Sequence, residues 1–285
     1  MRIRPAGSWR PPILRTRLFG FMLLAYGISW SLWLLQDMLE TSFSDNPWLG
    51  MLHLLGSLGP AAAGLCAACS SSGPRALRRL LARSLDWRAG GGLRALLWHG
   101  AAWLGPFLLL FLAQVLAQQA GANVLPGTLA VSPEFPGLPP WIYGLAVLVF
   151  YGFGEEIGWR GFALPLLQSR LHPVSATLIL SVIWAVWHWP LFLFSPGLTA
   201  LDAVGIAGWF ASLVTGAFLL TLLFNGTGGS VFLAAVFHAA MDIAFVGPPE
   251  VAMRVGFLTV LAGVIALAIL IVNGRRWAVQ DPVED

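Results

Sequence analysis

The stretch "FYGFGEEIGWRGFALP", Phe150 to Pro165, places two adjacent glutamates and an arginine inside sequence that is otherwise apolar. Of the 285 residues, 58% are hydrophobic, 10% are charged and 14 are tryptophan. Apolar runs recur on both sides of the stretch, and a run of about 18 or more residues can cross a bilayer as a helix. Because helices satisfy their own backbone hydrogen bonds in lipid, the composition predicts an all-α integral membrane protein and excludes a soluble domain.

We expect a bundle of about eight transmembrane helices, each long enough for the hydrocarbon core. Two linkers between them are long: the Arg-rich segment 73–88, and the Pro/Gly-rich segment 121–140, which is uncharged apart from Glu134. No internal repeat stands out, so residues 1–285 are expected to form a single polytopic domain. The predicted spans lie at about 18–36, 48–69, 95–117, 141–160, 176–199, 204–224, 230–247 and 251–272.

The arginines predict the orientation, since every basic residue in the chain is arginine. With the N-terminus in the cytoplasm and eight alternating spans, only Arg254 of the 16 basic residues falls outside. The positive-inside bias therefore favours both termini in the cytoplasm. The net charge of +3 then reflects topology and contact with anionic lipid, and no nucleic-acid partner is expected. The absence of lysine suggests a GC-rich bacterial genome and hence the bacterial inner, or plasma, membrane.

Cys66 and Cys69 form a CxxC motif on an apolar helix. A redox site or a zinc site would need a context that the neighbouring sequence does not provide, so small packing residues are the favoured interpretation. A disulfide framework is excluded.

Ionisable side chains inside the predicted spans are the main functional signal. Each costs about 2.5–3.5 kcal/mol near the middle of a bilayer, so each is by default a functional hypothesis. His53 and His99 also lie in or near spans, but each stands alone near an interface, and packing roles are favoured for both. The candidates are Glu155, Glu156, Arg160, His188, His238 and Asp242.

Spacing within the fourth span predicts distinct roles for its charges. Glu156 and Arg160 stand at i and i+4, the order that favours an ion pair on a helix. Glu155 is rotated by about 100° from Glu156 and can point into the bundle while Glu156 stays with its arginine.

Two further spans carry polar pairs one turn apart. Trp184 and His188 share a face of the fifth span, and His238 and Asp242 share a face of the seventh. At a rise of about 1.5 Å per residue, Glu155, His238 and His188 lie at comparable depths, roughly 8–15 Å from the cytoplasmic side. Polar residues that only hold helices together remain an alternative for each motif taken alone.

Together the three motifs resemble the CAAX-protease and bacteriocin-processing (CPBP) family of intramembrane glutamate proteases, which includes the Ras-converting endopeptidase and lysostaphin-resistance-type proteins. The family pattern is EExxxR, then an aromatic residue three positions before a histidine, then His-xxx-Asn/Asp. Here it reads "EEIGWR" at 155–160, "WAVWH" at 184–188 and "HAAMD" at 238–242. The resemblance covers a core of about residues 141–245.

The resemblance implies a membrane endopeptidase that needs no metal or other cofactor. Glu155 matches the general base that activates a water molecule, and His188 would orient that water. His238 and Asp242 would face the oxyanion. Glu156, Arg160 and Trp184 would hold this arrangement in place. The implied partner is a membrane-associated peptide or protein, either prenylated or a leader peptide, and bacteriocin immunity is a further role within the family.

Asp242 departs from the pattern, because the best-known members have asparagine there. An ionised aspartate would repel an oxyanion, whereas a protonated one could donate a hydrogen bond to it. Asp242 could instead orient His238, or share a proton with Glu155 as an acid dyad.

Three other readings stay open. Glu155, His188 and His238 could be ligands of a zinc-dependent membrane protease, although no HExxH pair is present. Glu/His/Asp relays also line proton-coupled transporters, although no repeated halves are visible. A non-catalytic immunity or binding protein could use the same fold.

Overall fold

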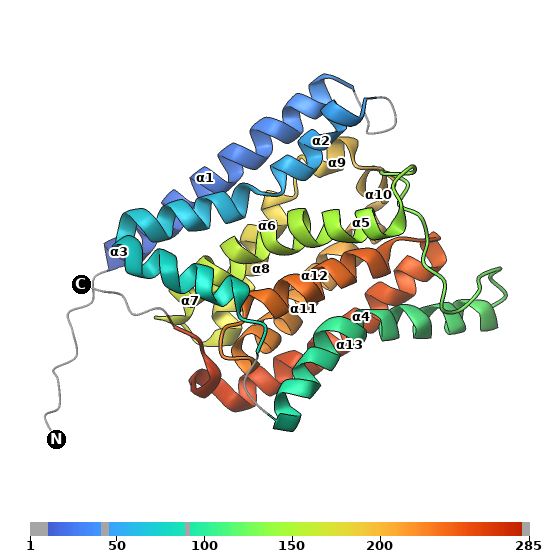
Figure 1. Ribbon diagram of the computed structural model, residues 1–285. Helices are drawn as coiled ribbons and strands as arrows, with labels where there is room; N and C mark the ends of the chain where they lie inside the picture. Colours follow the sequence, from blue (N-terminus) through green and yellow to red (C-terminus); the bar gives the residue numbers. More distant parts are fainter. Residues whose placement is uncertain (1–10, 41–45, 89–91, 281–285) are drawn as a thin grey trace, which may run out of the picture.

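A computed structural model of the chain describes residues 11–40, 46–88 and 92–280, which form helices and connecting loops without a strand. The all-α fold class is therefore confirmed. The first half contains α1 (Pro11–Met38), α2 (Pro47–Gly56), α3 (Gly59–Leu85), α4 (Gly92–Gln119), α5 (Pro140–Ala146), η1 (Val147–Phe153), α6 (Gly154–Gly158), η2 (Trp159–Ala163) and α7 (Leu164–Gln168). The second half contains α8 (Pro173–Trp187), α9 (Leu191–Phe194), α10 (Pro196–Thr199), α11 (Ala203–Gly226), α12 (Val231–Phe245), α13 (Pro249–Asn273) and η3 (Gly274–Trp277) (Figure 1).

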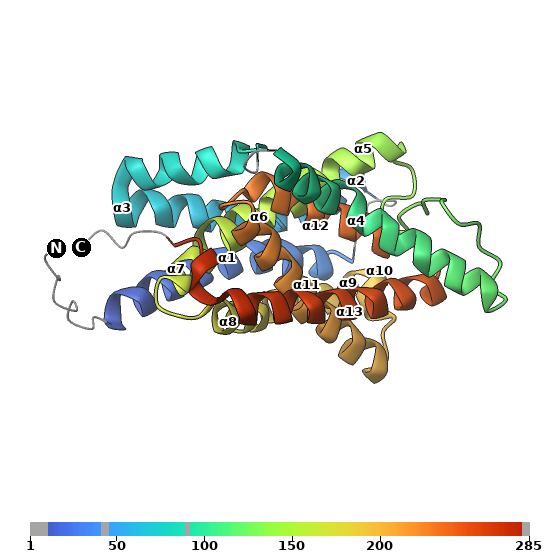
Figure 2. The same cartoon turned by 90° about the horizontal axis from the view of Figure 1, so that it is seen from below.

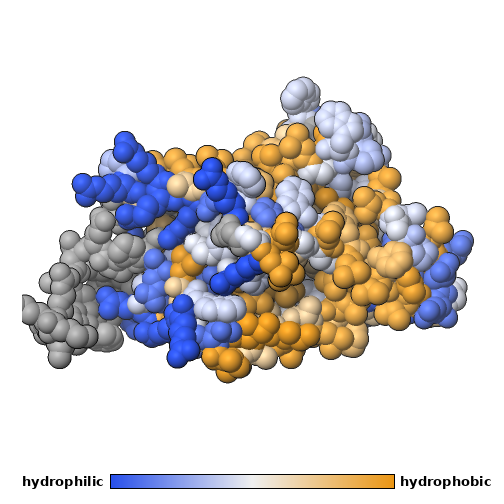
Figure 3. Space-filling view, turned by 60° about the horizontal axis from the view of Figure 1, so that its bottom comes forward, coloured by the Kyte–Doolittle hydropathy of each residue, from blue (hydrophilic) through white to orange (hydrophobic). Residues whose placement is uncertain are grey.

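Within the described residues, four helical segments are long and apolar enough to cross a membrane: 15–38, 92–119, 203–226 and 249–277. The consecutive helices 48–56 and 59–70, bent by 48°, make a fifth if they form one span. Figure 2 shows the long helices running roughly along one direction, with the loop between α4 and α5 at the end opposite the start of α1. A broad hydrophobic surface covers much of the face in Figure 3, while hydrophilic residues gather mainly at one end. This is the surface of a protein embedded in lipid.

Two predicted boundaries are wrong. The predicted fifth span, 176–199, is not one helix, because α8 ends at Trp187 and the short helices α9 and α10 follow. Pro190 has no N–H to donate and restricts the residue before it, which accounts for the early end. The predicted Arg-rich linker is mostly the second arm of α3, which bends back at Gly73 (φ 66°) and Pro74. The count of eight crossings stays a prediction.

A continuous helical segment from α5 to α7 occupies the middle of the structure, between α3 and α12 (Figure 1). Glycines allow this close packing. A Cβ at Gly152 would lie 2.5 Å from the Ala235 carbonyl oxygen of α12, and a Cβ at Gly158 would collide with the Pro60 carbonyl oxygen of α3. The segment includes two π-helical stretches, η1 and η2, on either side of α6. Such stretches occur frequently at functional sites.

Candidate active site

Trp184, near the end of α8, connects the predicted site residues. Its indole Nε1–H donates a hydrogen bond of 2.7 Å to Oε2 of Glu155, which is buried on α6. The rings of His188 and His238 lie 5.5 Å and 5.4 Å from the Trp184 ring, measured between centroids. Residues from α6, the end of α8 and α12 therefore meet around one indole ring, as the motifs predicted; their chemical roles stay predictions.

Glu156 faces a second partner that the sequence analysis missed. Its Oε1 lies 2.8 Å from an Arg160 guanidinium nitrogen and also 2.8 Å from Nδ1 of His238. The predicted ion pair thus forms, but the same carboxylate oxygen also holds a histidine from α12. All three side chains are buried, and Glu156 and Arg160 are fully so. A buried carboxylate that orients one histidine nitrogen leaves the other free for chemistry.

Arg160 also covers the face of Trp184. Its guanidinium carbon lies 4.8 Å from the centre of that ring, a cation–π contact between two buried side chains. The guanidinium therefore binds Glu156 at its edge and Trp184 on its face. The Trp184–Arg160 contact therefore links the two glutamates indirectly. Trp184 binds Glu155, and Arg160 binds Glu156.

His188, the C-cap residue of α8, is held by its own helix. Its Nδ1 lies 2.7 Å from the Trp184 carbonyl oxygen. A carbonyl only accepts, so Nδ1 carries the proton and Nε2 of the neutral ring is left as an acceptor. The ring packs against the rings of Trp187 and Trp209, at 4.9 Å and 5.6 Å. The arrangement suits a histidine that accepts a hydrogen bond from water.

Asp242 lies within ion-pair distance of His238 but is not hydrogen-bonded to it. The separation between Asp242 Oδ2 and His238 Nε2 is 3.7 Å, longer than a hydrogen bond. Asp242 is half-buried, whereas His238 is buried. The residue that orients His238 in this structure is Glu156.

His53 corrects another expectation, because it does not stand alone. It is buried on α2 and forms an ion pair or hydrogen bond through Nδ1 with Oε1 of Glu134. Its ring also lies 5.6 Å from the ring of Tyr151 in η1. Glu134 is the only charged residue of the loop between α4 and α5, and that isolation was the one signal in the sequence that could have indicated a buried partner.

No group of three or more His, Cys, Asp or Glu side chains among the described residues is placed to hold a metal ion. The zinc alternative thus gains no support from the placement of Glu155, His188 and His238. Cys66 and Cys69 are free thiols exposed on α3, so the interpretation as packing residues is wrong.

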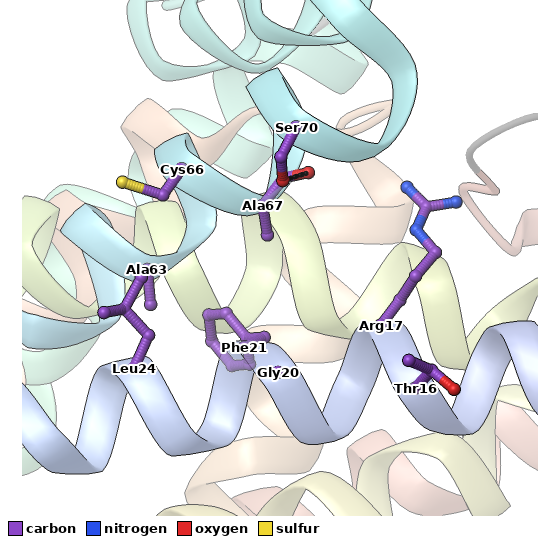
Figure 4. A pocket seen from close by; sticks show the side chains of 9 residues that line it. All are labelled: Thr16, Arg17, Gly20, Phe21, Leu24, Ala63, Cys66, Ala67 and Ser70. Carbon is purple, nitrogen blue, oxygen red and sulfur yellow. Dashed lines mark hydrogen bonds between the residues drawn. The ribbon is translucent and has the colours of Figure 1, made fainter.

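A pocket of about 260 Å³ lies between α1 and α3, away from the candidate residues (Figure 4). Phe21 and Leu24 of α1 and Ala63 and Cys66 of α3 line it, with Arg17 towards one end. None of the predicted site residues contributes to its wall. The pocket and the candidate active site are therefore separate features.

Comparison with known proteins agrees with the motifs. The family described as type II CAAX prenyl endopeptidase Rce1-like matches residues 137–244. A protein named CAAX prenyl protease 2, from Methanococcus maripaludis, is 28% identical over 104 residues, which are 35% of this chain and 38% of that relative. The match thus spans well under half of either protein, and it contains every residue of the candidate site. Residues 137–244 are therefore similar to the type II CAAX prenyl endopeptidases, in agreement with the resemblance that the three motifs carry.

Proposed function

We propose that this protein is an intramembrane endopeptidase, with residues 141–245 as its catalytic core. The observation that carries the proposal is the buried carboxylate of Glu155, which is held by Trp184, whose ring also lies against those of His188 and His238. A carboxylate removed from water and held beside histidines is suited to act as a general base.

In the proposed reaction, a water molecule lies between Glu155 and Nε2 of His188. Glu155 takes one proton from the water while the water oxygen forms a bond to the peptide carbonyl carbon. The carbonyl π electrons move onto its oxygen. His238 acts as an imidazolium in this scheme: its Nδ1–H donates to Glu156, and its Nε2–H donates a hydrogen bond to the oxyanion. The C–N bond then breaks, and the departing nitrogen takes the proton that Glu155 holds. No metal or other cofactor takes part in this scheme.

The proposed substrate is a peptide or protein attached to the membrane. The relative from Methanococcus maripaludis is named as a CAAX prenyl protease, which makes a prenylated peptide the first substrate to test. A lipid-anchored chain would reach a site that lies among apolar helices without leaving the bilayer. We place the protein in the plasma membrane of a bacterium, consistent with its composition and its membrane-spanning helices.

The test is cleavage of a fluorogenic farnesylated CaaX peptide by the purified protein in detergent or lipid vesicles. Glu155→Gln keeps the size of the side chain and removes its basicity, so kcat should fall by about 10²–10⁴-fold while the protein still folds. His188→Ala and His238→Ala should each be severely impaired. A Glu155→Gln protein that cleaves at the wild-type rate would sink the proposal. Activity lost with a chelator and restored by zinc would replace it with the zinc-dependent alternative.

A second experiment does not depend on the chosen peptide. Membrane proteomes of wild-type and Glu155→Gln cells are compared for polypeptides that accumulate uncleaved. Such polypeptides would identify the substrate class, whether prenylated or a leader peptide. If the two proteomes are identical and Glu155→Gln cells keep the wild-type phenotype, the protein has a non-catalytic immunity or binding role.

A further inference from the structure

Tyr151 carries a buried hydroxyl that the scheme above does not use. It lies in η1, one turn before Glu155 on the same continuous helical segment. Its hydroxyl oxygen is buried and has no hydrogen-bond partner among the described residues. A buried polar atom without a partner costs about 1–3 kcal/mol, so a fold retains one mainly where it has a use.

The surroundings of Tyr151 belong to the candidate site. The hydroxyl interacts electrostatically with the carboxylates of Glu155 and Asp242, and with Glu134 from the loop between α4 and α5. The His53 ring packs against the Tyr151 ring and is itself paired with Glu134. The phenol is thus a donor among acidic groups, on the helical segment that carries the proposed base.

The backbone around Tyr151 is π-helical and packs closely against α12. The Gly154 N–H bonds to the Val149 carbonyl five residues earlier, which is the π-helical pattern. The wider turn changes the angular position of Tyr151 relative to Glu155 compared with a regular α-helix. Gly152, directly after Tyr151, allows the segment to lie against the α12 backbone near Ala235. The segment that carries Tyr151 therefore packs directly against the helix that carries His238 and Asp242.

The proposed reaction requires more than one donor at the developing oxyanion. The His238 imidazolium offers only its Nε2–H, because its Nδ1–H donates to Glu156. Asp242, 3.7 Å from that Nε2, repels the oxyanion when it is ionised. A tyrosine hydroxyl, with an ordinary pKa of about 10, keeps its proton at neutral pH and can donate.

We propose that Tyr151 is a further catalytic residue, whose hydroxyl donates a hydrogen bond to the substrate carbonyl oxygen as that oxygen becomes negative. The proposal rests on the proposed function. No proton is transferred: the O–H bond stays intact, and the hydroxyl provides the second donor beside His238. The residues that the structure describes leave this donor unpaired, and the tetrahedral intermediate supplies its partner.

The test is Tyr151→Phe, which keeps the ring and removes only the hydroxyl. With the fluorogenic farnesylated CaaX peptide, kcat should fall by about 10²-fold with little change in KM, as expected for a lost oxyanion donor. Tm should be unchanged or higher, because the hydroxyl has no partner to lose. A structural role predicts the reverse: a lower Tm with nearly normal kcat.

Tyr26→Phe is the matched control, since the Tyr26 hydroxyl donates a 2.5 Å hydrogen bond to the Ile183 carbonyl oxygen. This variant should lose stability and keep most of its kcat. The Glu155→Gln protein, assayed alongside, separates the two proposals. If Glu155→Gln is inactive and Tyr151→Phe cleaves at the wild-type rate, only the role of Tyr151 is overturned. If Glu155→Gln cleaves normally, the proposed function itself fails.

Discussion

His238 and Glu156 meet with 2.8 Å between the imidazole Nδ1 and the carboxylate Oε1, although 82 positions separate them in the sequence. The same oxygen binds Arg160. One carboxylate therefore has two tasks: it neutralises the buried guanidinium of its own helical segment, and it orients a histidine of α12. The following predictions depend on this contact and on its neighbours.

Arg160→Ala should lower Tm and the amount of protein in the membrane. The substitution leaves Glu156 in a fully buried position without its arginine, and breaking a buried pair costs about 3–5 kcal/mol. The Arg160 contact with the Trp184 ring is lost as well. Thermal unfolding of the purified variant measures the effect, and an unchanged Tm would contradict it.

The reversed pair, Glu156→Arg with Arg160→Glu, should not recover activity even where it recovers some stability. An arginine at position 156 would face Nδ1 of His238, whose orientation depends on a carboxylate there. We expect the double variant to accumulate better than Arg160→Ala while its kcat stays near background. Wild-type kcat in the double variant would show that His238 does not need Glu156.

Trp184→Phe should reduce kcat by about 10–100-fold, because a hydrogen bond to a charged group contributes about 1.5–3 kcal/mol. Phenylalanine keeps an aromatic face for Arg160 but cannot donate to Glu155. Trp33→Phe is a matched control, since its indole donates to the His53 backbone carbonyl. The control should lose stability with little loss of kcat, and equal kcat losses in both variants would count against a specific role for Trp184.

Asp242→Asn should preserve or raise kcat. His238 is already oriented by Glu156, and Asp242 is too far from it for a hydrogen bond. The amide of asparagine adds a neutral donor beside the oxyanion and removes a negative charge. Steady-state kinetics with the farnesylated peptide measures the change. A large loss of activity would instead favour an acid dyad of Asp242 with Glu155.

Gly158→Ala should destabilise the protein strongly, because its Cβ would collide with the backbone carbonyl of Pro60 in α3. Gly144→Ala, on α5 of the same helical segment, is the control: its Cβ would meet nothing within 4 Å. Alanine is a better helix former than glycine, so the control should gain about 0.5–1 kcal/mol. A comparison of the two Tm values tests whether α3 and α6 pack as described.

Membrane topology can be tested with reporter fusions. Reporters placed after Gly92 and Arg275 should report the cytoplasm, and one placed after Ala130, in the loop between α4 and α5, should report the external side. The prediction rests on the uneven distribution of arginines between the two sides of the membrane, because the arginine-rich side faces the cytoplasm. An external signal at Gly92 would refute the eight-span arrangement.

Much of the fold was predictable from local signals. Apolar runs located the long helices, and spacing predicted the Glu156–Arg160 pair, because i and i+4 residues of a helix are neighbours whatever surrounds them. The contacts of Glu156 with His238 and of Glu134 with His53 were not predictable in this way. These two contacts depend on how segments that are distant in the sequence pack against each other. Spacing within one helix carries no information about that packing.

Helix ends were predicted less well, for a related reason. The π-helical turns leave no mark in hydropathy, and the bend of α3 at Gly73 replaced an expected linker with a second helical arm. Hydropathy averaged over a window also merged α8 with the short helices that follow Pro190. Such an average detects apolar length but not where the backbone turns.

The two helices that carry the candidate histidines are short. At a rise of about 1.5 Å per residue, the 15 residues of α8 and the 15 of α12 each extend roughly 22 Å, against about 30 Å of hydrocarbon in a typical bilayer. A mismatch of this size is met by local thinning of the lipid or by polar segments that enter the membrane. Either response brings the aqueous phase closer to His188 and His238 than helices as long as α4 or α13 would. The proposed hydrolysis needs a supply of water, and short helices shorten the path that this water has to travel.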